Sequence, residues 1–137
     1  MAESVLENIK NLPNVLAQIV EDTSVRVESL KKERPLSSFI NELVPSTRCL
    51  YKALSQENAG FILECKKASP SKGLIRDDFN VAEIARVYDK YAAGISVLTD
   101  EKYFQGHYDY LKTVAEIVNC PVLNKDFFID PYQVYLA

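Results

Sequence analysis

Hydrophobic residues recur at steps of three and four along the first part of the chain, which predicts a long helix after Pro13. The predicted helix face consists of Leu16, Ile19, Val20, Thr23, Val27 and Leu30. Pro35 should end this helix, because proline has no N–H to donate and its ring clashes with the preceding turn. Two shorter helices are expected next. One covers residues 36–43 and ends before Pro45, and the other starts after Ser46 as N-cap and carries Cys49, Leu50, Ala53 and Leu54.

From residue 60 the pattern changes to short apolar runs separated by longer helical stretches. The runs Phe61–Leu63, Ile95–Leu98 and Pro121–Leu123 are typical of strands in a parallel sheet that is covered on both faces. Helices with an apolar face are predicted after Asn80 and after His107.

Two further positions mark helix ends. Gly94 is expected to end the helix that begins at Asn80, and the pair Asp130–Pro131 fits the N-cap and first position of a further helix. Strands that alternate with helices imply right-handed crossovers and a parallel sheet, either doubly wound or closed into a barrel. No Gly-x-Gly-x-x-Gly or Walker-type loop follows the first strand, which argues against the nucleotide-binding version.

Composition bounds the class of protein. The chain has 137 residues, of which 47% are hydrophobic and 26% charged, the balance of a globular domain with one core. Its 19 acidic and 16 basic residues are mixed without a basic run, which argues against a nucleic-acid partner. No apolar stretch reaches the roughly 18 residues of a membrane span. Glu3 and Glu7 stand where a secretory signal carries bases, so a cytoplasmic protein is expected.

The cysteines Cys49, Cys65 and Cys120 are odd in number and far apart, without Cys-x-x-Cys spacing. This favours free thiols over a disulfide framework or a zinc site.

Polar residues gather directly after each predicted strand, in the segments Glu64–Gly73, Thr99–Phe104 and Asn124–Phe128. In a (β/α) barrel the reactive groups lie at these carboxyl ends of the strands. The three segments are therefore the places where a site is expected.

Alternation along the first strand places Glu64 and Lys66 on one face and Cys65 on the other. If that face lines a barrel mouth, the acid holds the lysine, which then binds an anionic group or transfers a proton. The alternative is that Glu64 and Lys66 form an ordinary surface ion pair, worth about 0–1 kcal/mol. Likewise, Lys125 after the third strand could be an ordinary solvated side chain. Glutamate and lysine beside aromatic residues at several strand ends favour a site.

The loop Ser69–Gly73 offers hydroxyls and free N–H groups for an oxyanion, although a plain turn has the same composition. Leu98, Phe104 and Phe127 fit the wall of a pocket for a flat aromatic substrate, although phenylalanine near a strand end more often belongs to the core. His107, the single histidine, is interpreted as a solvated residue at a helix N-terminus without a catalytic role.

Three segments resemble the first three strand signatures of the indole-3-glycerol phosphate synthase family, in the same order and spacing. They are FILECKKASPSKG (Phe61–Gly73), LTDEKYFQG (Leu98–Gly106) and NKDFFIDPYQ (Asn124–Gln133). The resemblance extends from about Leu12 onward, includes a helical segment before the barrel, and is greatest to the bacterial form fused to phosphoribosylanthranilate isomerase.

The resemblance implies a lyase of tryptophan biosynthesis. It closes the ring of 1-(2-carboxyphenylamino)-1-deoxyribulose 5-phosphate and releases carbon dioxide and water, without cofactor or metal. By motif position, Lys125 matches the general acid that protonates the substrate carbonyl, Lys66 the lysine that contacts the anionic groups and takes part in proton transfer, and Glu64 the acid that orients it. Ser69 matches a phosphate-loop position. The positions lining the anthranilate pocket are Leu98, Phe104 and Phe127.

The implied fold is the front part of a TIM (β/α)8 barrel, with a helical extension at 1–58 and the first three strands and two helices at 59–137. A complete barrel takes about 250 residues, so the chain is expected to hold part of the active site and to be inactive without the remainder of the barrel. Two other functions stay open. One is a Schiff-base aldolase with Lys66 or Lys125 as nucleophile, and the other is a non-catalytic α/β module that self-associates through its exposed sheet.

Overall fold

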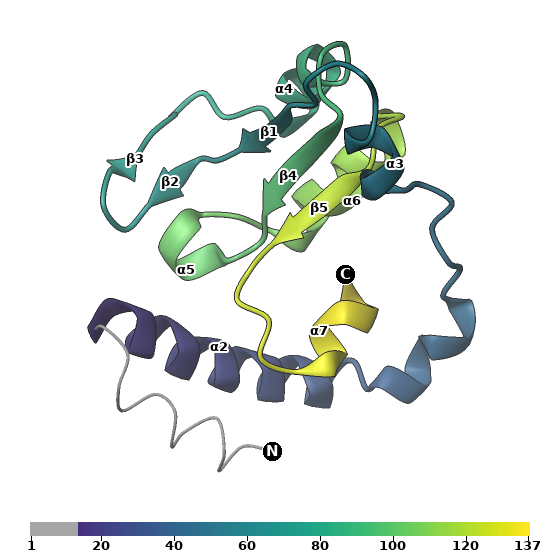
Figure 1. Ribbon diagram of the computed structural model, residues 1–137. Coiled ribbons are helices and arrows are strands. Elements are labelled where there is room, and N and C mark those ends of the chain that lie inside the picture. Colours follow the sequence, from purple (N-terminus) through teal and green to yellow (C-terminus); the bar gives the residue numbers. More distant parts are fainter. Residues whose placement is uncertain (1–13) are drawn as a thin grey trace. The chain divides into compact units, whose positions relative to one another are not determined.

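The computed structural model describes residues 14–137, which form two compact units, one of residues 14–44 with 127–137 and one of residues 45–126 (Figure 1). The first is helical, and the second combines helices with a parallel sheet, as the alternating pattern predicts. Within residues 14–137, no helix has the length and apolar character needed to cross a membrane. The boundary expected at residue 58 stays a prediction.

The first unit is built on helix α2 (Asn14–Glu33), which confirms the predicted helix. The predicted stripe is its buried face, with Ile19, Val20, Thr23 and Val27 removed from solvent. The Thr23 hydroxyl donates to the carbonyl oxygen of Ile19 at 2.7 Å, so this buried polar group is satisfied within the helix.

Residues 36–43 form two short 3-10 turns, η1 (Leu36–Ser38) and η2 (Ile40–Glu42), and the predicted helix there is wrong in type. Phe39 lies between the turns with φ −139° and ψ −8°, outside the helical region. Its ring is buried and meets the ring of Tyr132 edge-on, with 6.1 Å between centroids. Burial of the phenylalanine ring against Tyr132 favours this backbone over a continuous helix.

Helix α7 (Pro131–Leu136) begins at the predicted signal. The Asp130 carboxylate accepts the N–H of Tyr132 at 2.8 Å, and Gln133 completes a capping box. The two contacts satisfy backbone donors that the first turn of a helix leaves unpaired.

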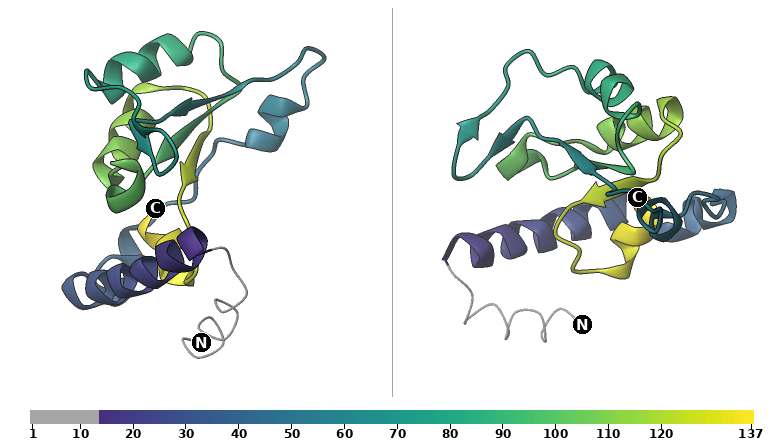
Figure 2. Two further views of the ribbon diagram at one scale, coloured as in Figure 1. Left: turned by 90° about the vertical axis from the view of Figure 1, so that its left-hand side faces the viewer. Right: turned by 45° about the horizontal axis from the view of Figure 1, so that its top comes forward.

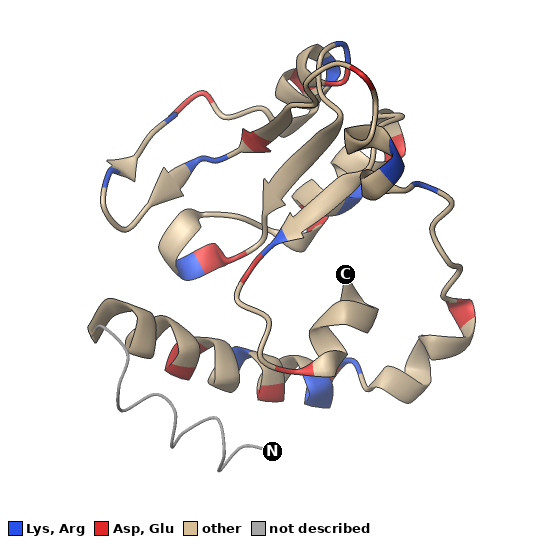
Figure 3. Ribbon diagram, viewed as in Figure 1, with Lys and Arg blue, Asp and Glu red and all other residues tan. Residues whose placement is uncertain are grey.

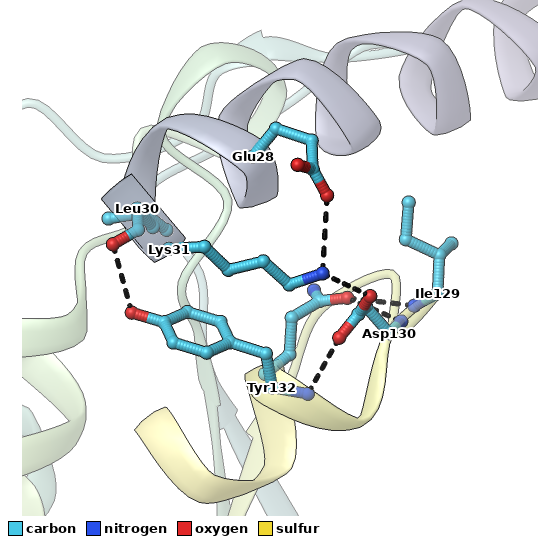
Figure 4. A network of polar contacts seen from close by, with 7 residues as sticks. Glu28, Leu30, Lys31, Ile129, Asp130 and Tyr132 are labelled. Atoms are coloured by element: carbon cyan, nitrogen blue, oxygen red, sulfur yellow. Dashed lines mark hydrogen bonds and ion pairs between the residues drawn. The ribbon is translucent and has the colours of Figure 1, made fainter. Parts of the chain in front are cut away.

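Helices α7 and α2 are joined by polar contacts (Figure 4). Lys31 Nζ lies 2.7 Å from Asp130 Oδ2, and the Tyr132 hydroxyl lies 3.1 and 2.8 Å from the carbonyl oxygens of Leu30 and Arg34. Partial burial pushes the pKa of Asp130 up, but the hydrogen bond and charge of Lys31 and the N–H of Tyr132 outweigh it, so this pKa lies below its usual range.

The side-chain amide of Gln133 fixes the loop before α7. Its Oε1 accepts the N–H groups of Ile129 at 2.8 Å and Asp130 at 3.1 Å, while Nε2 donates to the carbonyl oxygen of Phe127 at 2.9 Å. Gln133 is 0% exposed, so these bonds are shielded from water. The Asp130–Pro131 pair predicted the start of α7, but nothing in the sequence indicated these contacts of Gln133.

The second unit contains a parallel sheet in the order β1 (Ile62–Cys65), β4 (Gly94–Leu98), β5 (Val122–Lys125). Helices α4 (Val81–Tyr88) and α6 (Tyr108–Ile117) pack against one face of it (Figure 2). The core between helices and sheet is formed by Cys65, Val81, Ile84, Ala85, Ile95, Val97, Leu111, Val114 and Val118.

This core settles which way each strand residue faces. Cys65, Ile95 and Val97 belong to the core under the helices. Since side chains alternate along a strand, Glu64 and Ser96 lie on the opposite face, which α4 and α6 do not cover.

The first strand differs from its prediction. Phe61 lies just before β1 and is 60% exposed, and Ile62 is 45% exposed, so the strand is not covered on both faces. Ile62 has the parity of Glu64 and lies on the face that α4 and α6 do not cover, and among the described residues β1 pairs only with β4, so that it is an edge strand.

Two helix boundaries also differ. Helix α4 ends at Tyr88 rather than at Gly94, and Gly94 is the first residue of β4, where a Cβ atom would lie 2.7 Å from Cδ1 of Leu50. Helix α3 (Leu50–Leu54) has Cys49, not Ser46, as its N-cap residue.

Arg48 accounts for the late start of α3. Its guanidinium donates to the carbonyl oxygens of Ala115 at 2.8 Å and Cys120 at 3.3 Å, at the end of α6 and beyond it. These contacts keep the backbone before residue 50 extended.

Candidate functional site

The carboxyl ends of the three parallel strands lie on the same side of the sheet, and charged residues gather there (Figure 3). In the register, Glu64 pairs with Ser96, and Leu98 pairs with Lys125. Leu98 is two residues after Ser96 on β4, so the two side chains lie on the same face, and Lys125 is the partner of Leu98 on β5. Glu64, Ser96, Leu98 and Lys125 therefore all lie on the face away from α4 and α6.

Lys66 lies one residue beyond the pair Cys65 and Val97, at the level of Leu98 and Lys125. Neighbouring strands are about 4.8 Å apart, so the backbones of Lys66 and Lys125 should be about 10 Å apart, two strand spacings. Two long lysine side chains can reach a common small molecule across that distance.

Glu64 and Lys66 form an ion pair, with 2.6 Å between Oε1 and Nζ. The second carboxylate oxygen of Glu64 accepts the hydroxyl of Ser96 at 3.3 Å. Both charged side chains are about one-third exposed, so the pair itself adds only about 0–1 kcal/mol to stability. Its main effect is to hold the lysine ammonium at the strand end.

Lys125 is exposed at the end of β5. In the described part of the chain its ammonium has no ion-pair partner within 4.0 Å. An ammonium carries three donors and no acceptor, so this group is free to donate to a substrate oxygen.

Behind Lys125 lies a polar cluster whose residues fall in two of the segments where the sequence predicts a site, although their contacts with one another were not predicted. The Thr99 hydroxyl is 2.8 Å from Asn124 Oδ1 and 2.7 Å from Asp126 Oδ2, and the Thr99 N–H donates to the Lys125 carbonyl oxygen at 3.2 Å. Thr99 is 1% exposed. The sequence placed Thr99, Asn124 and Asp126 directly after two predicted strands, but it assigned no role to any of the three.

The predicted oxyanion loop is a small antiparallel hairpin of β2 (Ala68–Ser69) and β3 (Gly73–Leu74). The Ser69 hydroxyl accepts the N–H of Lys72 at 3.3 Å, a long bond within the turn. Gly73 has φ +65°, a left-handed conformation that glycine adopts without strain.

Phe104 is the last residue of the short helix α5 (Glu101–Phe104), which lies in the polar segment after the second predicted strand. Asp100 caps it by accepting the N–H of Tyr103 at 2.7 Å, and the N–H of Gly106 donates to the Asp100 carbonyl oxygen at 2.8 Å. A Cβ atom on Gly106 would lie 2.3 Å from the carbonyl oxygen of Leu98, so the loop returns directly against the end of β4.

Phe104 is half-buried, and its helix α5 contacts β2, which carries Ser69. Leu98 is buried at the sheet end. Phe127 belongs to the first unit, where its carbonyl oxygen is held by Gln133. A pocket lined jointly by Leu98, Phe104 and Phe127 stays a prediction.

The other functional expectations concern His107 and the cysteines. His107 caps α6, with its Nδ1 accepting the N–H of Asp109 at 3.0 Å, as the interpretation of a helix N-terminus requires. All three cysteines are free thiols, as predicted. Burial, with the nearby charge of Glu64, raises the pKa of Cys65 to about 11, so this thiol stays protonated and unreactive at neutral pH.

Comparison with known proteins identifies the family. The family model of indole-3-glycerol phosphate synthase matches residues 16–137. The chain is 59% identical over 126 residues to the tryptophan biosynthesis protein TrpCF of Salmonella typhi, covering 92% of this chain and 28% of that protein. It is 53% identical to TrpCF of Vibrio cholerae, and the match covers 100% of this chain and 30% of that protein. It is 55% identical to TrpCF of Haemophilus influenzae, and the match covers 90% of this chain and 26% of that protein. The chain thus spans less than a third of the length of these relatives, and it belongs to the indole-3-glycerol phosphate synthase family.

Proposed function

We propose that this chain forms the first three β/α units of a (β/α)8 barrel that closes the indole ring of 1-(2-carboxyphenylamino)-1-deoxyribulose 5-phosphate. The observation that carries the proposal is the common position of Glu64, Lys66 and Lys125 at the carboxyl edge of a parallel sheet, on the face away from the helices. This is where barrel enzymes hold their reactive groups. The family match over residues 16–137 supports the same conclusion.

Lys125 acts as general acid in the first step. The aromatic carbon that bears the carboxylate attacks the ketone carbon, a C–C bond forms, and the ketone oxygen takes a proton from the Lys125 ammonium and becomes a hydroxyl. Loss of carbon dioxide then returns an electron pair to the aromatic ring. The hydroxyl leaves with a proton from the neighbouring carbon, as water, and the indole ring is complete.

Lys66 binds an anionic group of the substrate, and Glu64 keeps its ammonium at the strand end through the 2.6 Å ion pair. Ser69 contributes to the phosphate end of the site. Leu98, Phe104 and Phe127 cover the anthranilate ring with apolar surface.

Further barrel strands supply the rest of the site. Among the described residues β1 and β5 are the outer strands of the sheet, and each has an edge to which a further strand can pair.

The test uses a chimera in which this chain replaces the matching part of TrpCF from Salmonella typhi. Ring closure is followed by indole fluorescence. The chimera should be active, and Lys125→Met should lower kcat by at least about 100-fold, the usual contribution of a positioned general acid. Lys112→Met, an exposed lysine on α6, is the matched control and should keep full activity.

An inactive chimera, or a Lys125→Met variant with unchanged kcat, would contradict the proposal. Borohydride separates the aldolase alternative, because reduction would trap a Schiff base as a stable adduct on Lys66 or Lys125. Under the proposed mechanism no adduct forms.

A further inference from the structure

Thr99 has contacts that packing alone does not explain. It directly follows β4, is 1% exposed, and its hydroxyl reaches both residues that flank Lys125. The distances are 2.8 Å to Asn124 Oδ1 and 2.7 Å to Asp126 Oδ2. These are ordinary lengths for hydroxyl hydrogen bonds, and the single proton of the hydroxyl lies between two acceptors. The Thr99 side of both contacts is buried, which protects them from competition by water.

The parity of the strands shows what these bonds do. Thr99 has the parity of Ile95 and Val97, which face the helices, and Asn124 has the parity of Val122, which packs against the same core. The hydroxyl therefore binds β5 from the helix side, one residue before Lys125 and one residue after it.

A residue whose two neighbours are held on one face must project its own side chain to the other face. The Thr99 N–H adds a third contact, to the Lys125 carbonyl oxygen at 3.2 Å, so every residue from 124 to 126 is tied to Thr99. Lys125 Nζ stands at the end of a long flexible side chain, and a fixed backbone is what restricts the volume that it can sample.

We propose that Thr99 is a positioning residue for Lys125, and that its hydroxyl aims the ammonium at the substrate carbonyl. This inference rests on the proposed function, in which Lys125 is the general acid. Thr99 itself touches no reacting atom in this proposal and acts only through the backbone of β5.

The experiment compares three variants in the active chimera. Thr99→Val removes the hydroxyl at nearly constant shape, Thr99→Ser keeps the hydroxyl, and Lys125→Met removes the acid. Misplacing the acid should lower kcat of Thr99→Val by about 10- to 100-fold with KM changed less than about twofold, because the lost interaction counts in the transition state. Thr99→Ser should recover most of kcat.

Coupling and a matched control separate positioning from loss of stability. In the Lys125→Met background, Thr99→Val should lower kcat no further, since there is no acid left to aim. Thr23→Val removes another buried threonine hydroxyl, which is 2% exposed and bonded at 2.7 Å within α2, and should reduce thermal stability without lowering kcat.

Three results would overturn the role of Thr99: an unchanged kcat for Thr99→Val, a failure of Thr99→Ser to recover activity, or an equal further loss in the Lys125→Met background. An inactive wild-type chimera would instead overturn the proposed function and this role with it. The two failures are therefore distinguishable. If Thr99→Val does not fold, Thr99→Ser and Asp126→Asn, which weakens the same bond from the other side, provide the comparison.

Discussion

Gln133 offers the sharpest test of how the first unit is held together. The perturbation is Gln133→Leu, which keeps the approximate size of the side chain and removes its amide. The variant loses three hydrogen bonds, from the N–H groups of Ile129 and Asp130 and to the carbonyl oxygen of Phe127, at 2.8, 3.1 and 2.9 Å. Gln133 is 0% exposed. A leucine side chain tolerates this burial, but it leaves the three backbone groups without their hydrogen-bond partner.

The expected loss of stability follows from those contacts. A net contribution of about 1 kcal/mol for each bond gives about 3 kcal/mol, and backbone groups left without a partner raise the total to about 3–5 kcal/mol. Burial of the extra apolar surface returns about 1 kcal/mol at most. The net loss of about 2–4 kcal/mol is a large fraction of the 5–15 kcal/mol that stabilises an ordinary domain.

The assay is urea denaturation followed by circular dichroism, with hydrogen exchange at the amides of Ile129 and Asp130. Both amides should exchange faster in Gln133→Leu than in the wild type, because they lose their acceptor. Val134→Ala on the same helix is the control. That side chain is 64% exposed, and its loss should change the free energy of unfolding by less than about 0.5 kcal/mol.

A Gln133→Leu variant as stable as Val134→Ala, with unchanged exchange at both amides, would refute the reasoning. Gln133→Glu gives an intermediate case, because it keeps the acceptor for both N–H groups and places a carboxylate oxygen against the Phe127 carbonyl. We expect its amide protection to survive better than that of Gln133→Leu.

Three further predictions concern pH, packing and thiol reactivity. The pKa of Asp130 in the folded protein lies below its unfolded value, so its carboxylate stabilises the fold above about pH 4. This stabilisation is lost as the pH falls through the folded pKa. Asp130→Asn keeps an N-cap residue but should weaken the loss of stability at acid pH, measured by urea denaturation at a series of pH values. Gly106→Ala places Cβ 2.3 Å from a strand carbonyl and should lower the melting temperature more than Gly94→Ala, where the 2.7 Å contact is with a flexible side chain; equal shifts would contradict this. With a thiol reagent at pH 7.5, exposed Cys49 should react at once and buried Cys65, with a pKa of about 11, only after unfolding.

The sequence by itself determined the elements whose signals are local. The stripe on α2, the Asn80 cap of α4 and the Asp130–Pro131 start of α7 all lie where the pattern predicts, because a helix is specified by contacts within a few residues. Apolar runs likewise indicated the parallel strands. The alternation along β1 also placed Glu64 and Cys65 on opposite faces, as the core under the helices confirms.

Tertiary structure decided everything that depends on residues distant in sequence. Phe39 breaks a predicted helix to reach Tyr132, and Arg48 delays α3 to bind carbonyl groups at the end of α6 and beyond it. The bonds of Thr99 to residues 25 and 27 positions away exist only because β4 and β5 are paired. A periodic pattern reports which side of an element is buried, but the partner of a buried polar group is set by the register between elements, and that register is fixed only when the chain packs.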